Sequence, residues 1–152
     1  MLEEDVIAKE RHEKFIEKVC ATEKVWTLEK DNGYATATSI HYEDDNDEPV
    51  EVLCFWSEKD LAELCAKEDW EGFKPVEIGL AEFIENWCIG MANDLILAGS
   101  DFDQELFGHE TDPLELILQL NDALLVQKKE LNLQNHKSMN DLINEIKKIL
   151  GE

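Results

Sequence analysis

His109 is the side chain best suited to acid–base chemistry, because it stands beside carboxylates in the segment Gly108-His109-Glu110-Thr111-Asp112. An imidazole changes charge near neutral pH, so an exposed His next to acids can act as a general acid or base. No Gly-x-Ser-x-Gly elbow, P-loop or dinucleotide-binding glycine pattern accompanies it. We therefore expect His109 to be a solvated loop residue and keep it as the one catalytic candidate. The loop spanning 101–112 is the place where a small enzyme or a ligand-binding protein would have its site.

Metal binding is not predicted from the spacing of the possible ligands. The four histidines have no His-x-x-x-His repeat and no neighbouring cysteine pair; they are His12, His41, His109 and His136. The acidic run 44–48 offers oxygen ligands, but it lacks the central Gly and the distal Glu of an EF-hand calcium loop. We expect a solvated acidic loop, and neither a metal nor a cofactor.

The cysteines and tryptophans are expected to be core residues, with one exception. Cys20, Cys54, Cys65 and Cys88 are far apart and have apolar neighbours, which is typical of unpaired thiols in a reducing cytoplasm. Trp26, Trp56 and Trp87 lie in apolar patterns. Trp70 instead lies in a connector among charged residues, so we predict an exposed anchor for a partner.

The charge of the chain favours a basic protein as its partner. The 36 acidic and 14 basic residues give a net charge of −22, which repels nucleic acid and anionic membranes. Only one basic residue, Arg11, is an arginine, the residue best suited to a bidentate phosphate contact. No apolar run is long enough for a membrane span, and the acidic segment 1–5 is unlike a signal peptide. We therefore predict a cytoplasmic, non-enzymatic protein-binding module, one concrete form of which is an immunity or antagonist protein. Its predicted partner contacts are Glu43, Asp44, Asp45, Asp47, Glu48 and Trp70.

The elements that position these residues begin with a helix over 3–21, where apolar residues recur at helical spacing. Strands over 25–28 and 34–42 flank Asn32-Gly33, a pair typical of a tight hairpin turn. Alternation over 50–56 predicts a third strand and thus an antiparallel meander. Ser57 is the expected N-cap of the next helix, with Asp60 three residues later.

The sequence predicts that the second half of the chain is mainly helical. A short strand over 75–78, a helix over 80–91 and a strand over 95–98 precede the 101–112 loop. A Leu-rich helix runs from Pro113 to about Leu131, and an amphipathic helix starts near Ser138. The fold class is α+β, with a three-stranded meander plus one or two short strands, covered by about five helices. Residues 1–134 form one acidic domain; helix 135–152 packs on it or lies at the interface of a homodimer.

Several of these segments together resemble a known bacterial family. They are Val25-Trp26-Thr27-Leu28, Gly33-Tyr34-Ala35, Phe55-Trp56-Ser57, Glu63-Leu64-Cys65-Ala66 with Trp70, and Phe73-Lys74-Pro75-Val76-Glu77-Ile78 with Phe83 and Trp87. The chain is similar here to the family of domain of unknown function 2750. The resemblance spans about 14–94, continues into the Leu-rich helix and leaves the final helix outside. It implies a small cytoplasmic bacterial protein of mixed α/β content, and it supplies no catalytic residues.

Overall fold

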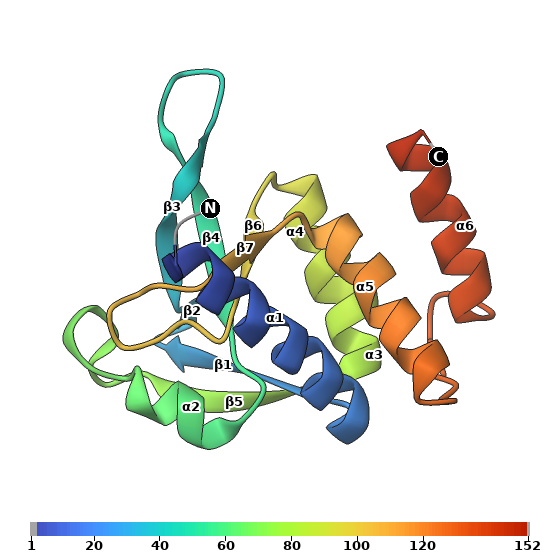
Figure 1. Ribbon diagram of the computed structural model, residues 1–152, viewed down its shortest axis with the longest axis horizontal. Coiled ribbons are helices and arrows are strands. Elements are labelled where there is room, and N and C mark those ends of the chain that lie inside the picture. The colour runs from blue at the N-terminus through green and yellow to red at the C-terminus, as the bar shows by residue number, and fades with distance from the viewer. Residues whose placement is uncertain (1–2, 152) are drawn as a thin grey trace.

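The computed structural model describes residues 3–151, apart from the side chains of 3–5, 40 and 41, and confirms the α+β class (Figure 1). The elements in chain order are α1 (Glu3–Thr22), β1 (Lys24–Lys30), β2 (Gly33–Tyr34), β3 (Thr36–Glu43), β4 (Pro49–Phe55), α2 (Lys59–Leu64), η1 (Glu68–Trp70), β5 (Lys74–Gly79), α3 (Leu80–Glu82), η2 (Phe83–Cys88), α4 (Ile89–Asn93), β6 (Leu97–Ser100), β7 (His109–Thr111), α5 (Pro113–Val126) and α6 (Met139–Leu150).

The strands form two sheets, whereas the sequence predicted one meander. The hairpin at Asn32-Gly33 is present, with Lys30 opposite Gly33, but β1 pairs on its other side with β5. β3 and β4 pair antiparallel in the second sheet, whose order is β3-β4-β6-β7. The chain crosses between the sheets at Ala35, which is fully buried; its N–H donates to Leu28 O and its carbonyl accepts from Cys54 N. A backbone pair between Trp26 and Trp56 joins the two sheets.

The segment after Leu95 contains two strands that place the candidate loop. β6 runs parallel to β4, with Phe55 opposite Ser100, so the predicted strand near 95–98 does pair with the β3–β4 unit. β7 then pairs antiparallel with β6, and His109 lies opposite Ser100. The prediction that His109 lies in a loop was therefore wrong, because its backbone belongs to this edge strand. The connection between β6 and β7, residues 101–108, is called the strap below.

The helices largely follow the predicted periods. α3, η2 and α4 are consecutive turns of one helical run with a π-helical middle, as predicted over 80–91. α5 begins at its Asp112 cap but ends at Val126, short of Leu131, because Lys128 adopts a left-handed φ of 58°. Ser138 caps α6 by accepting from Asp141 N, as predicted.

Two hydrophobic clusters hold the domain together. The larger one joins α1, η2, α5 and α6, and it includes Phe15, Phe83 and Leu120. The α6 face that enters it is buried and consists of Leu142, Ile143 and Ile146, so the final helix packs on its own domain. The smaller cluster lies under α2 and the strap; its members include Leu28, Val52, Cys54, Trp56, Cys65, Trp70 and Phe102. No helix within the described residues 3–151 is long and apolar enough to cross a membrane.

Candidate functional site

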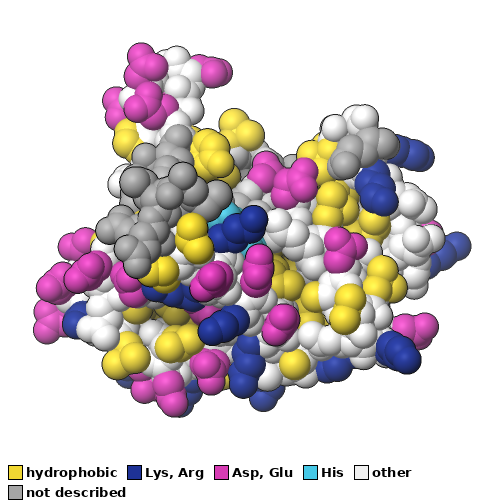
Figure 2. Space-filling view, viewed as in Figure 1, with side chains coloured by type: hydrophobic (Ala, Val, Ile, Leu, Met, Phe, Trp, Pro, Cys, Tyr) yellow, Lys and Arg dark blue, Asp and Glu magenta, His cyan; other side chains and the backbone are white. Residues whose placement is uncertain are grey.

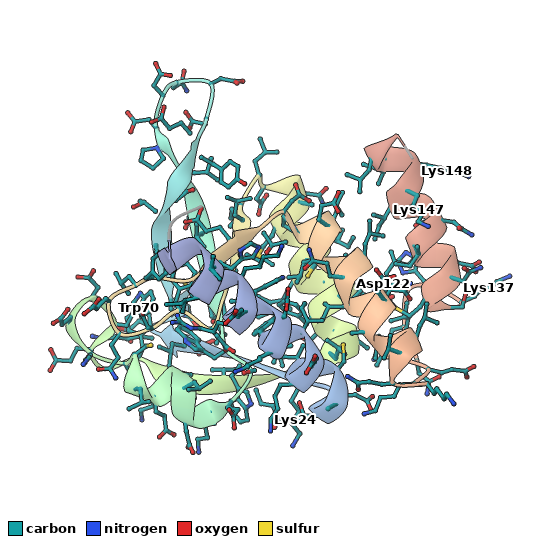
Figure 3. The ribbon with its side chains drawn as sticks, in the orientation of Figure 1. Lys24, Trp70, Asp122, Lys137, Lys147 and Lys148 are labelled. Atoms are coloured by element: carbon teal, nitrogen blue, oxygen red, sulfur yellow. The ribbon has the colours of Figure 1, made fainter. Side chains whose placement is uncertain are left out.

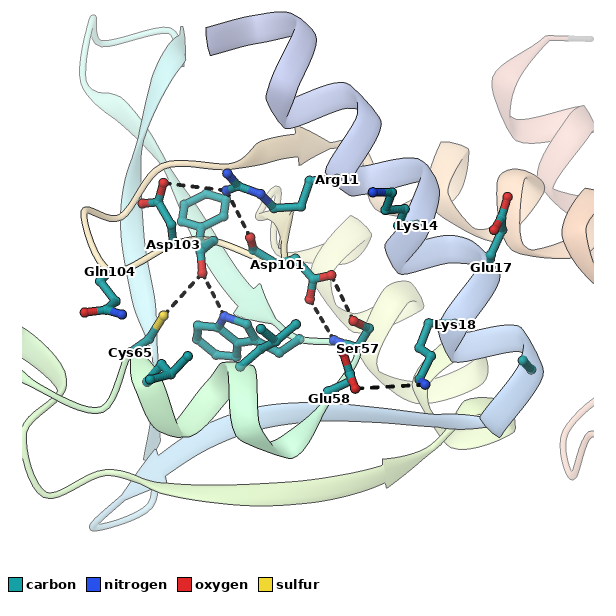
Figure 4. Close-up of a pocket in the computed structure, with 15 residues that line it drawn as sticks. Arg11, Lys14, Glu17, Lys18, Ser57, Glu58, Cys65, Asp101, Asp103 and Gln104 are labelled. Atoms are coloured by element: carbon teal, nitrogen blue, oxygen red, sulfur yellow. Dashed lines mark hydrogen bonds and ion pairs between the residues drawn. The ribbon is translucent and has the colours of Figure 1, made fainter.

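A cleft of about 670 Å³ lies between α1, α2 and the first residues of the strap (Figure 4). α1 lines it with Arg11, Lys14 and Lys18, which recur at helical spacing on one face of the helix. α2 and the turn before it supply the opposite wall, and residues 101–104 close one end. Three segments distant in the sequence thus meet at one hollow, called the cleft from here on.

The base of the cleft is apolar and firmly packed. Trp56 is fully buried, and Phe102 and Cys65 are each 4% exposed. The indole Nε1 of Trp56 donates to Phe102 O at 2.9 Å, and the thiol of Cys65 donates to the same oxygen at 3.2 Å. Leu61 and Leu64 of α2 continue the apolar surface toward solvent, and Leu64 is 55% exposed. A ligand with an apolar body would therefore meet a preformed surface of matching character.

Asp101 places a buried carboxylate in this apolar setting. The residue is 6% exposed, and its φ of 46° lies in the left-handed region, which costs a non-glycine residue about 1 kcal/mol. One carboxylate oxygen accepts from Ser57 N at 2.8 Å and the other accepts from Ser57 Oγ at 2.9 Å. Burial raises the pKa of Asp101, and the two hydrogen bonds from Ser57 only partly counter it.

Ser57 does not cap α2, and that prediction was wrong. Glu58 occupies the N-cap position without a side-chain hydrogen bond, while Ser57 is 6% exposed and donates to Asp101. The helix begins one residue later than a Ser57 cap requires, because Ser57, two residues after the end of β4, is hydrogen-bonded to Asp101 of the strap. A side chain that can cap a helix is here used to orient a carboxylate.

Arg11 holds the strap in place. Its guanidinium Nη1 donates to the carbonyls of Asp101 at 3.3 Å and Phe107 at 3.1 Å, and it pairs with Asp103 at 3.6 Å. One planar, permanently charged group thereby fixes several points of the same connection. The other two cations of the cleft make fewer contacts. Lys18 Nζ lies 3.9 Å from Glu58 Oε1, and no ion pair of Lys14 occurs among the described residues.

Two glycines allow the Phe102 ring to approach the second sheet closely. A Cβ on Gly99 would come within 2.7 Å of the Phe102 ring and 2.9 Å of Val52. A Cβ on Gly108 would meet Phe102 Cδ1 and, at 3.0 Å, Ser100 O. The strap can therefore approach the sheet closely only where side chains are missing.

His109 lies outside the cleft lining and belongs to a separate polar network. Its ring centroid is 4.4 Å from that of His12, which is 5% exposed. His12 Nε2 and Nδ1 lie 2.6 Å from Gln119 Oε1 and Ser100 Oγ, and since Gln119 Oε1 can only accept, Nε2 carries the proton. Burial is the main reason that the pKa of His12 falls to about 4, so this ring is neutral at physiological pH.

The predicted partner contacts are separated in space. Asp44, Asp45, Asp47 and Glu48 are exposed at the tip of the β3–β4 hairpin, which projects from the body of the molecule (Figures 1 and 2). Trp70 is instead 3% exposed and packs edge-on against Trp56, with centroids 5.6 Å apart (Figure 3 labels it). The prediction of an exposed anchor was wrong because the short η1 turn directs this ring inward.

The cysteines and the possible metal ligands were the remaining candidates for a functional site, and the structure supports neither among the described residues. All four cysteines are free and buried, as predicted, and burial raises the pKa of each thiol, to about 11 for Cys20. Within the part of the chain that the structure describes, no group of three or more His, Cys, Asp or Glu side chains could hold a metal ion. The side chain of His41 lies outside the described residues.

A family model described as "Protein of unknown function (DUF2750)" matches residues 12–120. The chain belongs to this family. No curated protein and no solved structure matches the chain in the parallel comparisons. The DUF2750 match covers every lining residue of the cleft from Lys14 to Gln104, begins one residue after Arg11, and ends within α5, so α6 lies beyond it.

Sequence patterns do not predict the cleft, although they point to the 101–112 loop that contains the strap. Asp101 lies at the edge of that loop, and His109 is the residue there whose neighbours indicate acid–base chemistry. One signal was present: Arg11 is the only arginine in a strongly acidic chain, and its length and donors suit it to holding a distant segment. Ser57 gave no such signal, because its neighbours fit a helix cap.

Proposed function

We propose that this protein binds a small organic ligand in the cleft between α1, α2 and the strap. The observation that carries the proposal is a hollow of about 670 Å³ whose base is apolar and whose wall holds a buried carboxylate. Ligand sites typically have volumes of roughly 300–1,000 Å³ and combine apolar walls with a few oriented polar groups. Trp56 and Phe102 supply the first feature and Asp101 the second.

The arrangement around Asp101 indicates that the cleft is a binding site and not an incidental gap in the packing. A left-handed aspartate with a buried carboxyl group is costly, and costs of this kind are concentrated at functional sites. Ser57 and Arg11 hold the residue from two other segments, which fixes the position of the carboxylate before a ligand arrives. The four buried free thiols support the prediction of a cytoplasmic location.

A fragment screen by ¹H–¹⁵N NMR tests the proposal, with chemical shifts followed at the Trp56 indole N–H and the Ser57 amide. We expect some fragments to shift these two signals in the wild type. The same fragments should cause no shift in Leu64→Trp, whose larger side chain fills the cleft from α2. Val126→Trp is the matched control, because it adds the same ring at an 82% exposed position of α5 outside the cleft lining. Absence of any shift at Trp56 and Ser57 across the library, or equal loss in both variants, would contradict ligand binding at the cleft.

We propose as a second candidate function that the β3–β4 hairpin binds a basic protein. The supporting observation is the placement of four exposed acids on a projecting tip, where they can approach a partner without contact by the rest of the domain (Figure 2). Asp44 shapes the tip by accepting from Asn46 N at 2.8 Å and Glu48 N at 3.1 Å, so it is left unchanged in the test.

The test is low-salt capture from the native cytosol with a hairpin variant and a variant of equal charge. The hairpin variant carries Asp45→Asn, Asp47→Asn and Glu48→Gln; the control carries Glu10→Gln, Asp122→Asn and Glu130→Gln, at exposed sites on α1, on α5 and after α5. We expect one basic protein to be retained by the wild type and the control but lost from the hairpin variant. Retention by all three, or by none, removes the support for this candidate.

A further inference from the structure

Asp101 combines burial with the absence of an ion pair: it is 6% exposed, whereas Glu17, the other cleft acid without an ion pair among the described residues, is exposed. The cleft is lined by four acids and three cations: Glu17, Glu58, Asp101 and Asp103 against Arg11, Lys14 and Lys18. Arg11 pairs with Asp103, and Lys18 approaches Glu58. The carboxylate oxygens of Asp101 receive hydrogen bonds from the neutral groups of Ser57, and no ion pair to them occurs among the described residues. Arg11 donates to the backbone carbonyl of Asp101 and acts on the carboxylate through its charge alone, without an ion-pair contact.

We propose that the cleft binds an organic cation, a protonated primary amine attached to an apolar body, with its ammonium group on the carboxylate of Asp101. This inference rests on the proposed ligand-binding function and names the chemical class of the ligand. A buried carboxylate without a counter-ion gains most from a cationic hydrogen-bond donor, because the partner both restores the lost solvation and neutralises the charge.

The hydrogen-bonding capacity of Asp101 fits this role. A carboxylate offers about four acceptor positions, and Ser57 occupies one on each oxygen. The remaining positions can accept from an ammonium group, which has three donors and no acceptor. Ser57 fixes the rotation of the carboxylate with two bonds, so an incoming amine meets a group that is already oriented.

The charge of the protein acts in the same direction at longer range. A chain with a net charge of −22 attracts cations and repels anions, and a low-dielectric hollow concentrates the field. Within the cleft the acids exceed the cations by one residue. The long-range and the local balance therefore both favour a cationic ligand over a carboxylate or phosphate ligand.

The apolar body of the ligand has a defined place beside the amine. Figure 4 shows Ser57 and Asp101 side by side. Trp56, Phe102, Leu61 and Leu64 line the same cleft. An amine at Asp101 would direct its attached chain over these apolar groups. The free energy of burying that chain then adds to the ion pair.

Three probes of equal skeleton separate the amine from other classes: phenylbutylamine, phenylbutanol and phenylbutyrate. Their dissociation constants are measured by NMR titration at the Trp56 indole and the Ser57 amide. We expect the amine to bind at least about tenfold more tightly than the alcohol and the carboxylate. In Asp101→Asn, we expect this preference to disappear while the affinity for the alcohol is unchanged.

The variants are chosen to keep the fold. An asparagine at 101 can still accept from Ser57 N, and its amide can donate to Ser57 Oγ, so the strap keeps its attachment. Glu10→Gln is the matched control, because it removes the same charge from an exposed position of α1 outside the cleft lining. It should preserve the preference for the amine.

The outcomes distinguish this inference from the function beneath it. If phenylbutanol or phenylbutyrate binds at the cleft as tightly as the amine, ligand binding stands and the amine class is refuted. Equal loss of the amine preference in Glu10→Gln and Asp101→Asn would assign the preference to general charge and likewise refute a specific contact. If no probe perturbs Trp56 or Ser57 at any concentration, and the fragment screen is also empty, the ligand-binding function itself fails.

Discussion

Glu85 fastens the segment that leads into α6, and its removal should measurably destabilise the domain. Its side chain is 3% exposed, and its carboxylate accepts from Gln134 N at 2.6 Å, Asn135 N at 2.7 Å and His136 Nδ1 at 2.9 Å. At about 1 kcal/mol for each lost hydrogen bond, Glu85→Ala should lower the free energy of unfolding by about 3 kcal/mol. For a domain of this size the corresponding fall in Tm is roughly 10 °C.

The pH dependence provides an independent check of the same contact. Burial raises the pKa of Glu85, but the hydrogen bonds from His136, Gln134 and Asn135 outweigh it, so the pKa lies below its ordinary value of 4.5. Because the pKa of Glu85 is lower in the folded state, the ionised carboxylate stabilises the fold fully at pH values above the unfolded-state pKa. This stabilisation is lost as the pH falls through the folded-state pKa. The difference between wild type and Glu85→Ala should therefore be constant near neutral pH and shrink below about pH 4.5.

Urea unfolding at several pH values measures both quantities. Glu145→Gln is the control, because Glu145 contacts the other ring nitrogen of His136 at 3.3 Å but is 63% exposed. An exposed pair of this kind contributes less than about 1 kcal/mol. The reasoning is refuted if Glu85→Ala unfolds within about 0.5 kcal/mol of the wild type at pH 7, or if the two variants lose equal stability.

Three further predictions concern packing, titration and reactivity. Gly108→Ala should lower the free energy of unfolding by about 1–3 kcal/mol through overlap with Phe102, as measured by urea unfolding; no loss would mean that the strap moves freely. His12 has a folded-state pKa of about 4 against 6.5, so wild-type stability should decline as the pH falls from 6.5 toward 4, and urea unfolding of His12→Gln should show a smaller decline. The four thiols should resist an aromatic disulfide reagent at pH 8 in the folded protein and react fully in urea; fast labelling of the native state would contradict their burial.

Local sequence patterns predicted the elements better than their pairing. The helices over 3–22, 80–93 and 139–150 follow apolar spacing that each segment carries by itself. The hairpin at Asn32-Gly33 is equally local. The division into two sheets is not local, because it depends on Ala35 being bonded to β1 on one side and β4 on the other. A single buried alanine gives no sequence signal of that kind.

The cleft was hidden for the same reason. Arg11 is 90 residues from Asp101, and Ser57 is 44 residues from it, so neither contact is visible in a local pattern. Trp70 shows the opposite error, since its charged neighbours suggested exposure while its ring lies against Trp56. For the residues around Asp101 and for Trp70, a tertiary contact determines the role of the residue, whereas its neighbours in the sequence indicate a different role.

Glu85 and Asp101 are both buried carboxylates, but only Asp101 lies beside an open cleft and can still accept hydrogen bonds from a ligand. Glu85 receives three donors, one of them from a histidine, and its pKa is lowered. Asp101 receives two donors from a single serine, in a strained backbone, and burial leaves its pKa raised. Glu85 is thus satisfied by the fold, whereas the charged form of Asp101 is under-stabilised beside an open hollow. A partner that supplies the missing positive charge would bring Asp101 to the condition that Glu85 already has, which is why the amine is sought at this carboxylate and not at the other.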